Sequence, residues 1–563
     1  MSPSMSLNRF WFCLSLVVCS LVLSCKEAKQ PPTSDIVKTP EQLLEKTEDY
    51  IKKNIHYAVV HNGLIGDSTF LFYAELEQAI YKEKDYSALW SRDERWKPAG
   101  DSLIRFIREA KLYGLYPKHY HLAFLDSVDQ QFSLDSLGQT SRKDAALWAK
   151  ADVLLTDAFL HIVKDVKLGR LPQDSITLRK DSVLTDSFYS TKLDTVLRSA
   201  TITPIIATLE PAHEGYILLK AGIREFLDSV DNRTYTKVPA TRDSTFKRLL
   251  QLRLFEGGYI SYDTTQADSA QLSNAIKKFQ KLKKITVDGI AGEGTIRLLN
   301  VTDDDRFASI AITLDRYKML PSKMPERYIW VNLPSFYLRL QDKDSVKVVS
   351  KIICGKSKTR TPVLTSSISE IVTYPQWTVP NSIILKEILP GIKRDTAYLA
   401  KRGFSLIDSK GDEIDPSTVN WAKYTKGIPY KVVQGSGDAN ALGILKFNFP
   451  NKYAVYLHDT NQRYLFGTPV RTFSHGCVRV QEWEKIANYM IRKDYPELEE
   501  DIPSLDSLNA WLERKEKHSI PVKNRLPVFI RYFTSEGSPE GIIFYDDIYG
   551  EDRFLRARYY DGK

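Results

Sequence analysis

The sequence predicts a multidomain α+β protein with a helical N-terminal scaffold, a small three-helix domain and a β-rich domain that carries a helix and loop insertion. Three observations support this fold class. The chain has 563 residues, enough for three or four domains, and its 43% hydrophobic and 26% charged residues are an ordinary globular mixture. Apolar residues recur at three- and four-residue steps in the first half of the chain. Runs of β-branched and aromatic residues between turn formers dominate the second half.

Residues 1–24 have the pattern of a signal peptide. Asn8-Arg9 precedes an apolar stretch, Phe10–Leu23, that is too short to span a membrane comfortably. The ending Leu21-Val22-Leu23-Ser24-Cys25 resembles a bacterial lipobox, in which Cys25 is lipidated, and Lys26 resembles that position in lipoproteins sorted to the outer membrane. Because acyl chains stabilise membrane residence by about 0.8 kcal/mol per buried CH₂, we expect a periplasmic lipoprotein of the cell envelope. The alternative is signal cleavage without a lipid.

Residues 25–39 are expected to form a flexible tether, and residues 40–246 a helical scaffold. Five segments place apolar residues on one helical face: Glu41–Lys53, Thr69–Lys82, Asp101–Leu112, Lys143–Val166 and Ile217–Val230. The histidines of this region lack regular metal-ligand spacing. His119 and His121 precede no acidic or cysteine partner, so we expect structural or surface roles for them and no metal site.

Residues 247–305 are expected to form the small three-helix domain. Leu272, Ala275, Ile276 and Phe279 would share one helical face, and Val287–Gly292 contains turn formers. A further helix should begin close to Thr295, near its N-cap. This order of residues resembles a peptidoglycan-binding domain, whose groove receives stem peptide. A structural spacer is the alternative.

Residues 306–500 should form the β-rich domain. Its expected strands are Tyr328–Leu333, Phe336–Leu340, Val346–Ile353, Ile368–Thr373, Leu445–Asn448 and Tyr453–His458. The pattern breaks over about residues 383–424, where we expect an insertion of helix and loop. The last segment, residues 501–563, should contain a helix at Ser504–Glu513 and a hairpin-like pair of strands, Val528–Phe533 and Gly541–Tyr545. We expect it to pack on the β domain or the scaffold.

The most informative motif is Ser474-His475-Gly476-Cys477-Val478-Arg479, preceded by His458-Asp459-Thr460. A thiol attacks carbonyls as its thiolate, which a histidine within hydrogen-bond reach can generate. Gly476 lets the backbone approach a substrate or take an unusual φ, and Arg479 adds positive potential. A buried structural cysteine is the alternative. Cys354 is the other cysteine left after signal removal, and we expect both as free thiols.

The two motifs, in this order and separation, resemble the signature of L,D-transpeptidases of the YkuD type, which are bacterial cysteine enzymes that remodel peptidoglycan. The resemblance to their large, YcbB-like branch extends to Ala110–Tyr120, Leu154–Leu160, Gly169–Pro172, Gly355-Lys356, Arg360–Pro362, Tyr374–Pro380 and Asn440–Asn451. In relatives the insertion forms a mobile cap over the substrate, and residues 383–424 match that place. An inert surface excursion is the alternative. Many smaller relatives have Gly where this chain has Asp459, which leaves the third catalytic group open.

The resemblance implies that Cys477 attacks a donor tetrapeptide at the bond between its L-centre and D-alanine, and that the amine of an acceptor diaminopimelate resolves the thioester into a 3-3 cross-link. His458 would be the base, oriented by the backbone or side chain of Asp459. Backbone N–H groups of the His475–Cys477 turn, with Gly476, would hold the oxyanion. His475 itself either tunes the thiolate or shapes the turn.

Four further residues are expected in the substrate-binding shell: Arg479, Tyr456, Trp377 and Ser474. Strand alternation would place Tyr456 and His458 on the same side. Arg479 could instead form a structural ion pair. By resemblance, carbapenem-type β-lactams should acylate Cys477.

Other classes of function are weighed against this one. Hydrolysis of the thioester (an L,D-carboxypeptidase) or attachment of a protein to the wall would need only a different acceptor. A non-enzymatic peptidoglycan-binding lipoprotein would not need His458 and Cys477 together. The net charge of +9 could favour the carboxylate-bearing wall polymer or anionic lipid heads. No nucleic-acid module, phosphate loop or metal pair is present, and we expect no cofactor.

Overall fold

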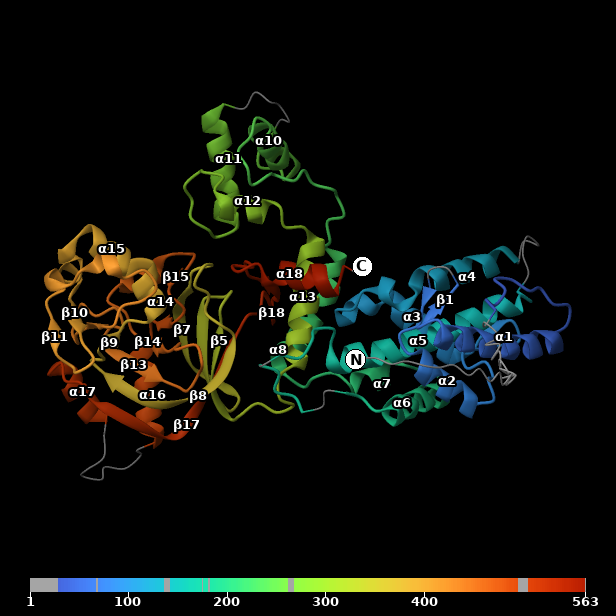
Figure 1. Ribbon diagram of the computed structural model, residues 1–563. Coiled ribbons are helices and arrows are strands. Elements are labelled where there is room, and N and C mark those ends of the chain that lie inside the picture. Colours follow the sequence, from blue (N-terminus) through green and yellow to red (C-terminus); the bar gives the residue numbers. More distant parts are fainter. Residues whose placement is uncertain are drawn as a thin grey trace, which may run out of the picture. The chain divides into compact units, whose positions relative to one another are not determined.

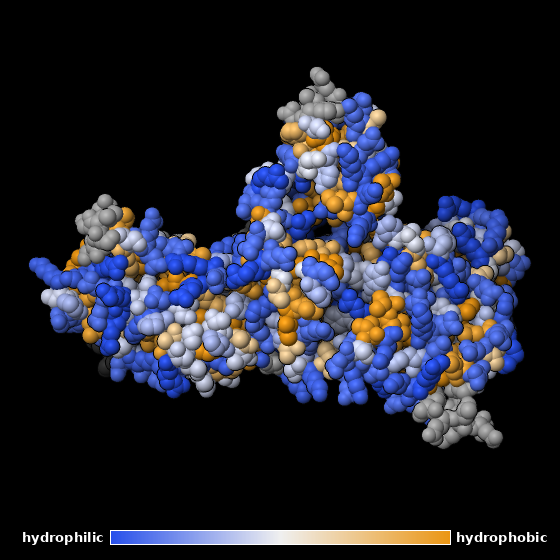
Figure 2. Space-filling model, turned by 180° about the vertical axis from the view of Figure 1, so that it is seen from behind, coloured by the Kyte–Doolittle hydropathy of each residue, from blue (hydrophilic) through white to orange (hydrophobic). Residues whose placement is uncertain are grey.

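The computed structural model describes residues 29–66, 69–135, 142–174, 176–180, 183–261, 268–494 and 505–561. The signal peptide, Cys25 and the start of the tether lie outside these residues. Contacts divide the chain into two compact units, Met1–Gly100 with Phe124–Asp157, and Asp101–Ala123 with Ala158–Lys563. In the described part of the chain, no helix combines the length and the apolar character needed to cross a membrane. Hydrophilic residues predominate on the face shown in Figure 2, and apolar residues lie there in separate patches.

The N-terminal half is helical, as predicted (Figure 1). Its helices are α1 (Pro40–Val60), α2 (Ala74–Glu83), α3 (Pro98–Arg108), α4 (Leu122–Asp135), α5 (Ala145–Leu168), α6 (Asp186–Ser199), α7 (Thr203–Ala207), α8 (Glu214–Ala221) and α9 (Ile223–Asp228). The limits of the predicted helices shift by a few residues, and two of the helices differ in kind. The start of Thr69–Lys82 is instead strand β2 (Thr69–Phe70), which pairs with β1 (Leu64–Ile65). Helix Ile217–Val230 is broken at Gly222, which packs so closely on Ile542 that a Cβ would lie 2.7 Å from it.

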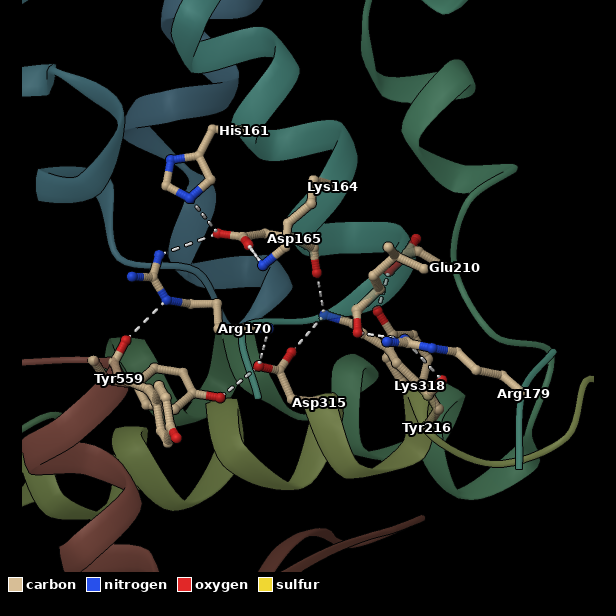
Figure 3. Close-up of polar contacts among 12 residues, drawn as sticks. His161, Lys164, Asp165, Arg170, Arg179, Glu210, Tyr216, Asp315, Lys318 and Tyr559 are labelled. Atoms are coloured by element: carbon tan, nitrogen blue, oxygen red, sulfur yellow. Dashed lines mark hydrogen bonds and ion pairs between the residues drawn. The ribbon is translucent and has the colours of Figure 1, made fainter. Parts of the chain in front are cut away.

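A buried charge network ties the end of α5 to helix α13 (Asp303–Lys318), which precedes the β-rich domain (Figure 3). Asp165 is fully buried and accepts hydrogen bonds from Tyr120 (2.8 Å) and Arg170 (3.1 Å). Lys318 donates to the Asp165 carbonyl (2.9 Å) and to Asp315 (2.9 Å), which also accepts from the Arg170 N–H (2.8 Å). Because breaking one member of a buried charge pair is strongly destabilising, this network holds α5 and α13 in a fixed relation.

The three-helix domain consists of α10 (Phe246–Glu256), α11 (Ser269–Leu282) and α12 (Glu293–Leu299). Ala275, Ile276 and Phe279 are buried, as predicted. The N-cap of α12 is Gly292, whereas the predicted cap, Thr295, lies inside the helix and is buried. The buried amide of Gln280 donates from Nε2 to the Thr295 hydroxyl (3.1 Å), which explains why Thr295 is buried.

The β-rich domain is built on a nine-stranded sheet in the order β15-β7-β16-β14-β13-β8-β17-β5-β6, which closes because β6 also pairs with β7. The strands are β5 (Arg327–Asn332), β6 (Tyr337–Asp342), β7 (Ser345–Gly355), β8 (Leu364–Thr373), β13 (Leu445–Asn448), β14 (Leu457–His458), β15 (Thr472–Ser474), β16 (Val478–Val480) and β17 (Ser519–Arg531). Helices α16 (Trp483–Asp494) and α17 (Leu505–Glu513) pack their apolar faces on the core of this sheet. The predicted multidomain α+β class is therefore confirmed.

The predicted C-terminal hairpin is wrong. Residues Val528–Arg531 belong to β17, a central strand between β8 and β5, and Gly541–Phe544 (β19) pairs instead with β18 (Ser535–Ser538). Both runs have strand character, but the pairing partner depends on burial: Val528 and Ile530 are completely enclosed by the main sheet. The last helix of the described residues is α18 (Glu551–Tyr559), which the sequence pattern did not predict.

The insertion is larger than predicted and is a folded subdomain, here called the cap (residues 377–434). It contains a four-stranded sheet in the order β11-β10-β12-β9, formed by β9 (Trp377–Thr378), β10 (Phe404–Ile407), β11 (Glu413–Ile414) and β12 (Lys431–Gln434). Helix α14 (Asn381–Ile383), a π-helical turn (Ile384–Ile388) and α15 (Leu389–Arg394) cover this sheet with their own apolar cluster. The segment therefore has its own core, and its predicted role as a mobile cap over the substrate stays a prediction.

The base of the cap is held by one side chain. Nδ2 of Asn440, which is buried, donates to the carbonyls of Pro375 (3.2 Å), Gln434 (3.3 Å) and Gly435 (2.7 Å), so both strands that enter and leave the cap meet at this amide.

Candidate active site

Three neighbouring strands bring the charged residues of the site into one row. Lys446 on β13 is paired with His458 on β14, and His458 is paired with Arg479 on β16. Directly paired residues point to the same face of a sheet. Their neighbours along the strands, such as Leu457 and Val478, are fully buried on the other face. Cys477 directly precedes β16, and the charges of Lys446 and Arg479 act on its thiol, so the thiol lies close to the row.

The turn before Cys477 is held by Ser474, which is buried. Its hydroxyl donates to the Cys477 carbonyl (2.5 Å) and accepts from the Gly476 N–H (3.1 Å). The Ser474 hydroxyl is thus engaged within the turn, and the expected contact of Ser474 with substrate stays a prediction. The Gly476 N–H is engaged in the same turn, and its expected oxyanion role stays a prediction. Gly476 is needed for its φ of +125°, which other residues rarely adopt.

The imidazole of His458 is buried and is oriented by a backbone carbonyl. Its Nδ1 lies 2.5 Å from the Asp459 carbonyl oxygen. Because this oxygen can only accept, Nδ1 carries the proton and Nε2 is left as the basic nitrogen. The side chain of Asp459 is engaged elsewhere, by Arg463 (2.7 Å) and by the Ile444 N–H (3.1 Å). Of the two predicted ways in which Asp459 could orient the imidazole, the structure has the backbone one.

Burial sets the protonation state of the site. It lowers the pKa of His458 to about 4, with the Arg479 charge acting in the same direction. It raises the pKa of the Cys477 thiol, although the Tyr456 backbone and the charges of Lys446 and Arg479 act in the opposite direction. Near neutral pH the free protein therefore holds a neutral thiol and a neutral imidazole.

The three other residues expected in the substrate-binding shell lie in different parts of the structure. Arg479 donates to Gln462 (2.9 Å), and its buried Nε has no hydrogen-bond partner among the described residues, which argues against a purely structural role. Tyr456 precedes β14, so the expectation that it shares a strand with His458 is wrong, yet its carbonyl accepts from the Val478 N–H (3.0 Å) and keeps it beside Cys477. Trp377 lies in β9, half-buried among cap residues, with its ring 6.0 Å from Phe404.

Two site residues were missed by the sequence reasoning. Lys446 joins the row through strand pairing. The signal available in the sequence was a cation at the second position of the predicted strand Leu445–Asn448. Glu387, in the π-helical turn of the cap, has its Oε1 2.5 Å from Nε2 of His475. His475 therefore contacts the cap, a role that neither of its predicted alternatives included.

Comparison with known proteins agrees with these features. Residues 75–222 match the model of a scaffold domain, residues 247–299 that of a "Putative peptidoglycan binding domain", and residues 326–496 that of the YkuD L,D-transpeptidase catalytic domain. A Haemophilus influenzae protein named "Putative L,D-transpeptidase" is 34% identical over 245 residues, which cover 43% of this chain and 48% of that protein. The chain thus spans about half the length of the curated relative it matches.

One solved structure is also similar, an L,D-transpeptidase from Stackebrandtia nassauensis. It is 15% identical and covers 46% of this chain and 91% of that chain, with a TM-score of 0.16, which is too low to support an argument about this chain. The sheet, its site and the family matches define a multidomain protein with a catalytic domain of the L,D-transpeptidase class. More narrowly, residues 326–496 are a YkuD domain and residues 247–299 a peptidoglycan-binding domain, so the predicted resemblance is confirmed.

Proposed function

We propose that this protein is a cysteine L,D-transpeptidase that forms 3-3 cross-links between peptidoglycan stem peptides during cell wall remodelling. The observation that supports this most directly is the row on β13, β14 and β16, in which His458 lies beside Arg479, whose charge acts on the Cys477 thiol. The substrate would be a tetrapeptide stem as donor and the side-chain amine of diaminopimelate as acceptor.

In the first half-reaction, Nε2 of His458 takes the proton of the Cys477 thiol as the sulfur attacks the donor carbonyl. General-base help of this kind is worth roughly 10²–10⁴ in rate. The C–N bond to D-alanine then breaks, and the imidazolium returns its proton to the leaving amine. The product is a thioester on Cys477 and free D-alanine.

The oxyanion of this step would be held by the Cys477 N–H. Among the described residues this group has no acceptor, whereas the Gly476 N–H is bound by Ser474. Losing one such donor typically costs 10²–10³ in kcat. Arg479, with its unfilled Nε, and Tyr456 are proposed to contact the donor peptide, and Trp377 would contribute from the cap.

In the second half-reaction the acceptor amine attacks the thioester, passes its proton to His458, and releases the thiolate, which takes that proton back. Water or a protein amine could resolve the same thioester. Incubation with a defined tetrapeptide, followed by mass spectrometry, separates these outcomes: a cross-linked dimer is expected, a tripeptide alone would indicate a carboxypeptidase, and no D-alanine release would refute the proposal.

We further propose the division of the chain made from the sequence, with residues 40–246 as scaffold, 247–305 as wall-binding domain and 306–500 as catalytic domain. Residues 1–24 would be removed and Cys25 lipidated, which would hold the enzyme in the cell envelope at the outer membrane. Cys25→Ala should yield a protein without acyl mass. An acylated Cys25→Ala protein would refute the lipid proposal.

A further inference from the structure

Lys446 is a cation of the catalytic face to which no role has been assigned. It lies in the same cross-strand row as His458 and Arg479, and strands in a sheet are about 4.8 Å apart. Lys446 and Arg479 therefore flank the imidazole on its two sides. The Lys446 Nζ lies 3.7 Å from the centroid of the Tyr456 ring, which fixes the direction of its side chain toward the neighbourhood of Cys477.

The ammonium of Lys446 lacks a carboxylate partner. No carboxylate of the described residues forms an ion pair with it, and Glu370, which lies on the adjacent strand β8, accepts hydrogen bonds from Asn448 (2.5 Å) and Ser519 instead. Burial lowers the pKa of Lys446, while Cys477 and Glu370 act in the opposite direction. The Tyr456 ring stabilises this half-buried cation only in part, and a negatively charged ligand would stabilise it further.

The position of Lys446 fits one particular group of the donor. When Cys477 attacks, the residue that leaves carries the C-terminal carboxylate, and one residue spans at most roughly 3.6 Å. That carboxylate must therefore lie within about one strand spacing of the reacting carbonyl. The Lys446 ammonium, over the Tyr456 ring and close enough to Cys477 for their charges to interact, can reach this space. A donor with further residues beyond the cleaved bond would carry its carboxylate past this cation.

We propose that Lys446 binds the C-terminal carboxylate of the donor peptide and thereby selects donors that end one residue after the bond that is cleaved. This inference rests on the proposed function, because it uses the donor and bond named there. Lys446 would be a specificity-determining residue, and Arg479 on the other side of His458 would remain available for the acyl part of the donor.

Binding to the full mature chain with Cys477→Ala tests this without turnover. Isothermal titration would compare two tetrapeptides that differ only at the C-terminus, one a free acid and one an amide. Lys446→Met should weaken binding of the acid on the order of 10- to 100-fold, the range for a hydrogen bond to a charged group, and leave the amide within about twofold. Lys446→Arg should retain most of the affinity for the acid. Lys452→Met is the matched control, since Lys452 is exposed and outside the row, and should change neither peptide.

Equal losses for the two peptides, no loss at all, or no measurable binding of the acid by Cys477→Ala would each overturn the assignment of Lys446. A different result would refute the proposed function. If the unmodified enzyme released no D-alanine while the Lys446-dependent preference for the acid persisted, the reaction would be wrong and the carboxylate site would stand.

Discussion

Nε2 of His475 lies 2.5 Å from Oε1 of Glu387, so the turn that carries Cys477 is bonded directly to the π-helical turn of the cap. Both side chains are partly exposed, at 28% and 48%. Exposed pairs of this kind are typically worth up to about 1 kcal/mol, which is small enough to break and re-form during turnover. Single π-helical turns occur frequently at functional sites. The pair is therefore suited to hold the cap near the thiol without locking it.

The first prediction concerns this contact. Glu387→Ala should increase the rate at which a small neutral alkylating reagent modifies Cys477, by up to about fivefold, because an exposed pair worth up to about 1 kcal/mol joins the cap to the nucleophile turn. The rate is measured by intact-protein mass spectrometry with peptide mapping. Glu413→Ala is the control, since Glu413 is an exposed carboxylate on cap strand β11. An unchanged rate in Glu387→Ala would show that the contact does not restrict access.

A second prediction separates the two thiols. Cys477→Ala and Cys477→Ser should abolish cross-linking and the covalent adduct of a carbapenem, because a serine hydroxyl in this geometry stays protonated. Cys354→Ala should retain both activities, since Cys354 is fully buried and burial raises its pKa to about 12. Intact-protein mass spectrometry with peptide mapping shows which cysteine carries the adduct. A carbapenem adduct on Cys354, or cross-linking by Cys477→Ala, would contradict the assignment of the nucleophile.

The third prediction concerns pH. His458 must be neutral to act as a base, and its pKa is lowered to about 4, so kcat/KM should fall on the acid side only as the pH approaches 4. An unperturbed histidine would give an acid limb near 6.5. Alkylation of Cys477 in the free enzyme should require alkaline pH, because the pKa of the thiol is raised. An acid limb in kcat/KM close to 6.5 would refute the burial argument.

The stability of the folded protein should also depend on pH through His458. The folded pKa of His458 lies below its unfolded value, so the unfolded state binds more protons between about pH 6.5 and 4. The contribution of neutral His458 to the free energy of unfolding is complete above about pH 6.5 and is lost as the pH falls through about 4. Denaturant unfolding at several pH values, compared with His458→Gln, measures this dependence. Equal acid sensitivity in both proteins would count against it.

The fifth prediction concerns the backbone of the nucleophile turn. Gly476→Ala places a side chain at φ +125°, a conformation that costs of the order of 1–3 kcal/mol, although the new Cβ would have room, 3.7 Å from the nearest atom. We expect the turn to shift and acylation of Cys477 to fall at least tenfold. Gly467→Ala is the control, since no atom lies within 4 Å of that Cβ and its φ is ordinary. Full activity in Gly476→Ala would show that the turn adapts.

The sequence predicted the helices of the scaffold and most strands of the sheet, because both depend on local periodicity. Strand β13 has the predicted limits, Leu445–Asn448, and α5 begins and ends two residues from its prediction. The predicted hairpin of Val528–Phe533 with Gly541–Tyr545 was wrong because strand pairing does not depend on local periodicity. Any two apolar runs can pair, and only the assembled sheet decides that β17 lies between β8 and β5.

The sequence by itself determined the candidate groups: a cysteine, a histidine and a glycine in a spacing that resembles one family. The tertiary structure alone decided how those groups are arranged. Ser474 supports the turn, Asp459 acts through its carbonyl, Lys446 enters by strand register, and Glu387 reaches His475 across 88 positions of sequence. Motifs record which groups a reaction needs, whereas these contacts arise from backbone register and packing between segments that are distant in sequence, and local patterns do not encode either.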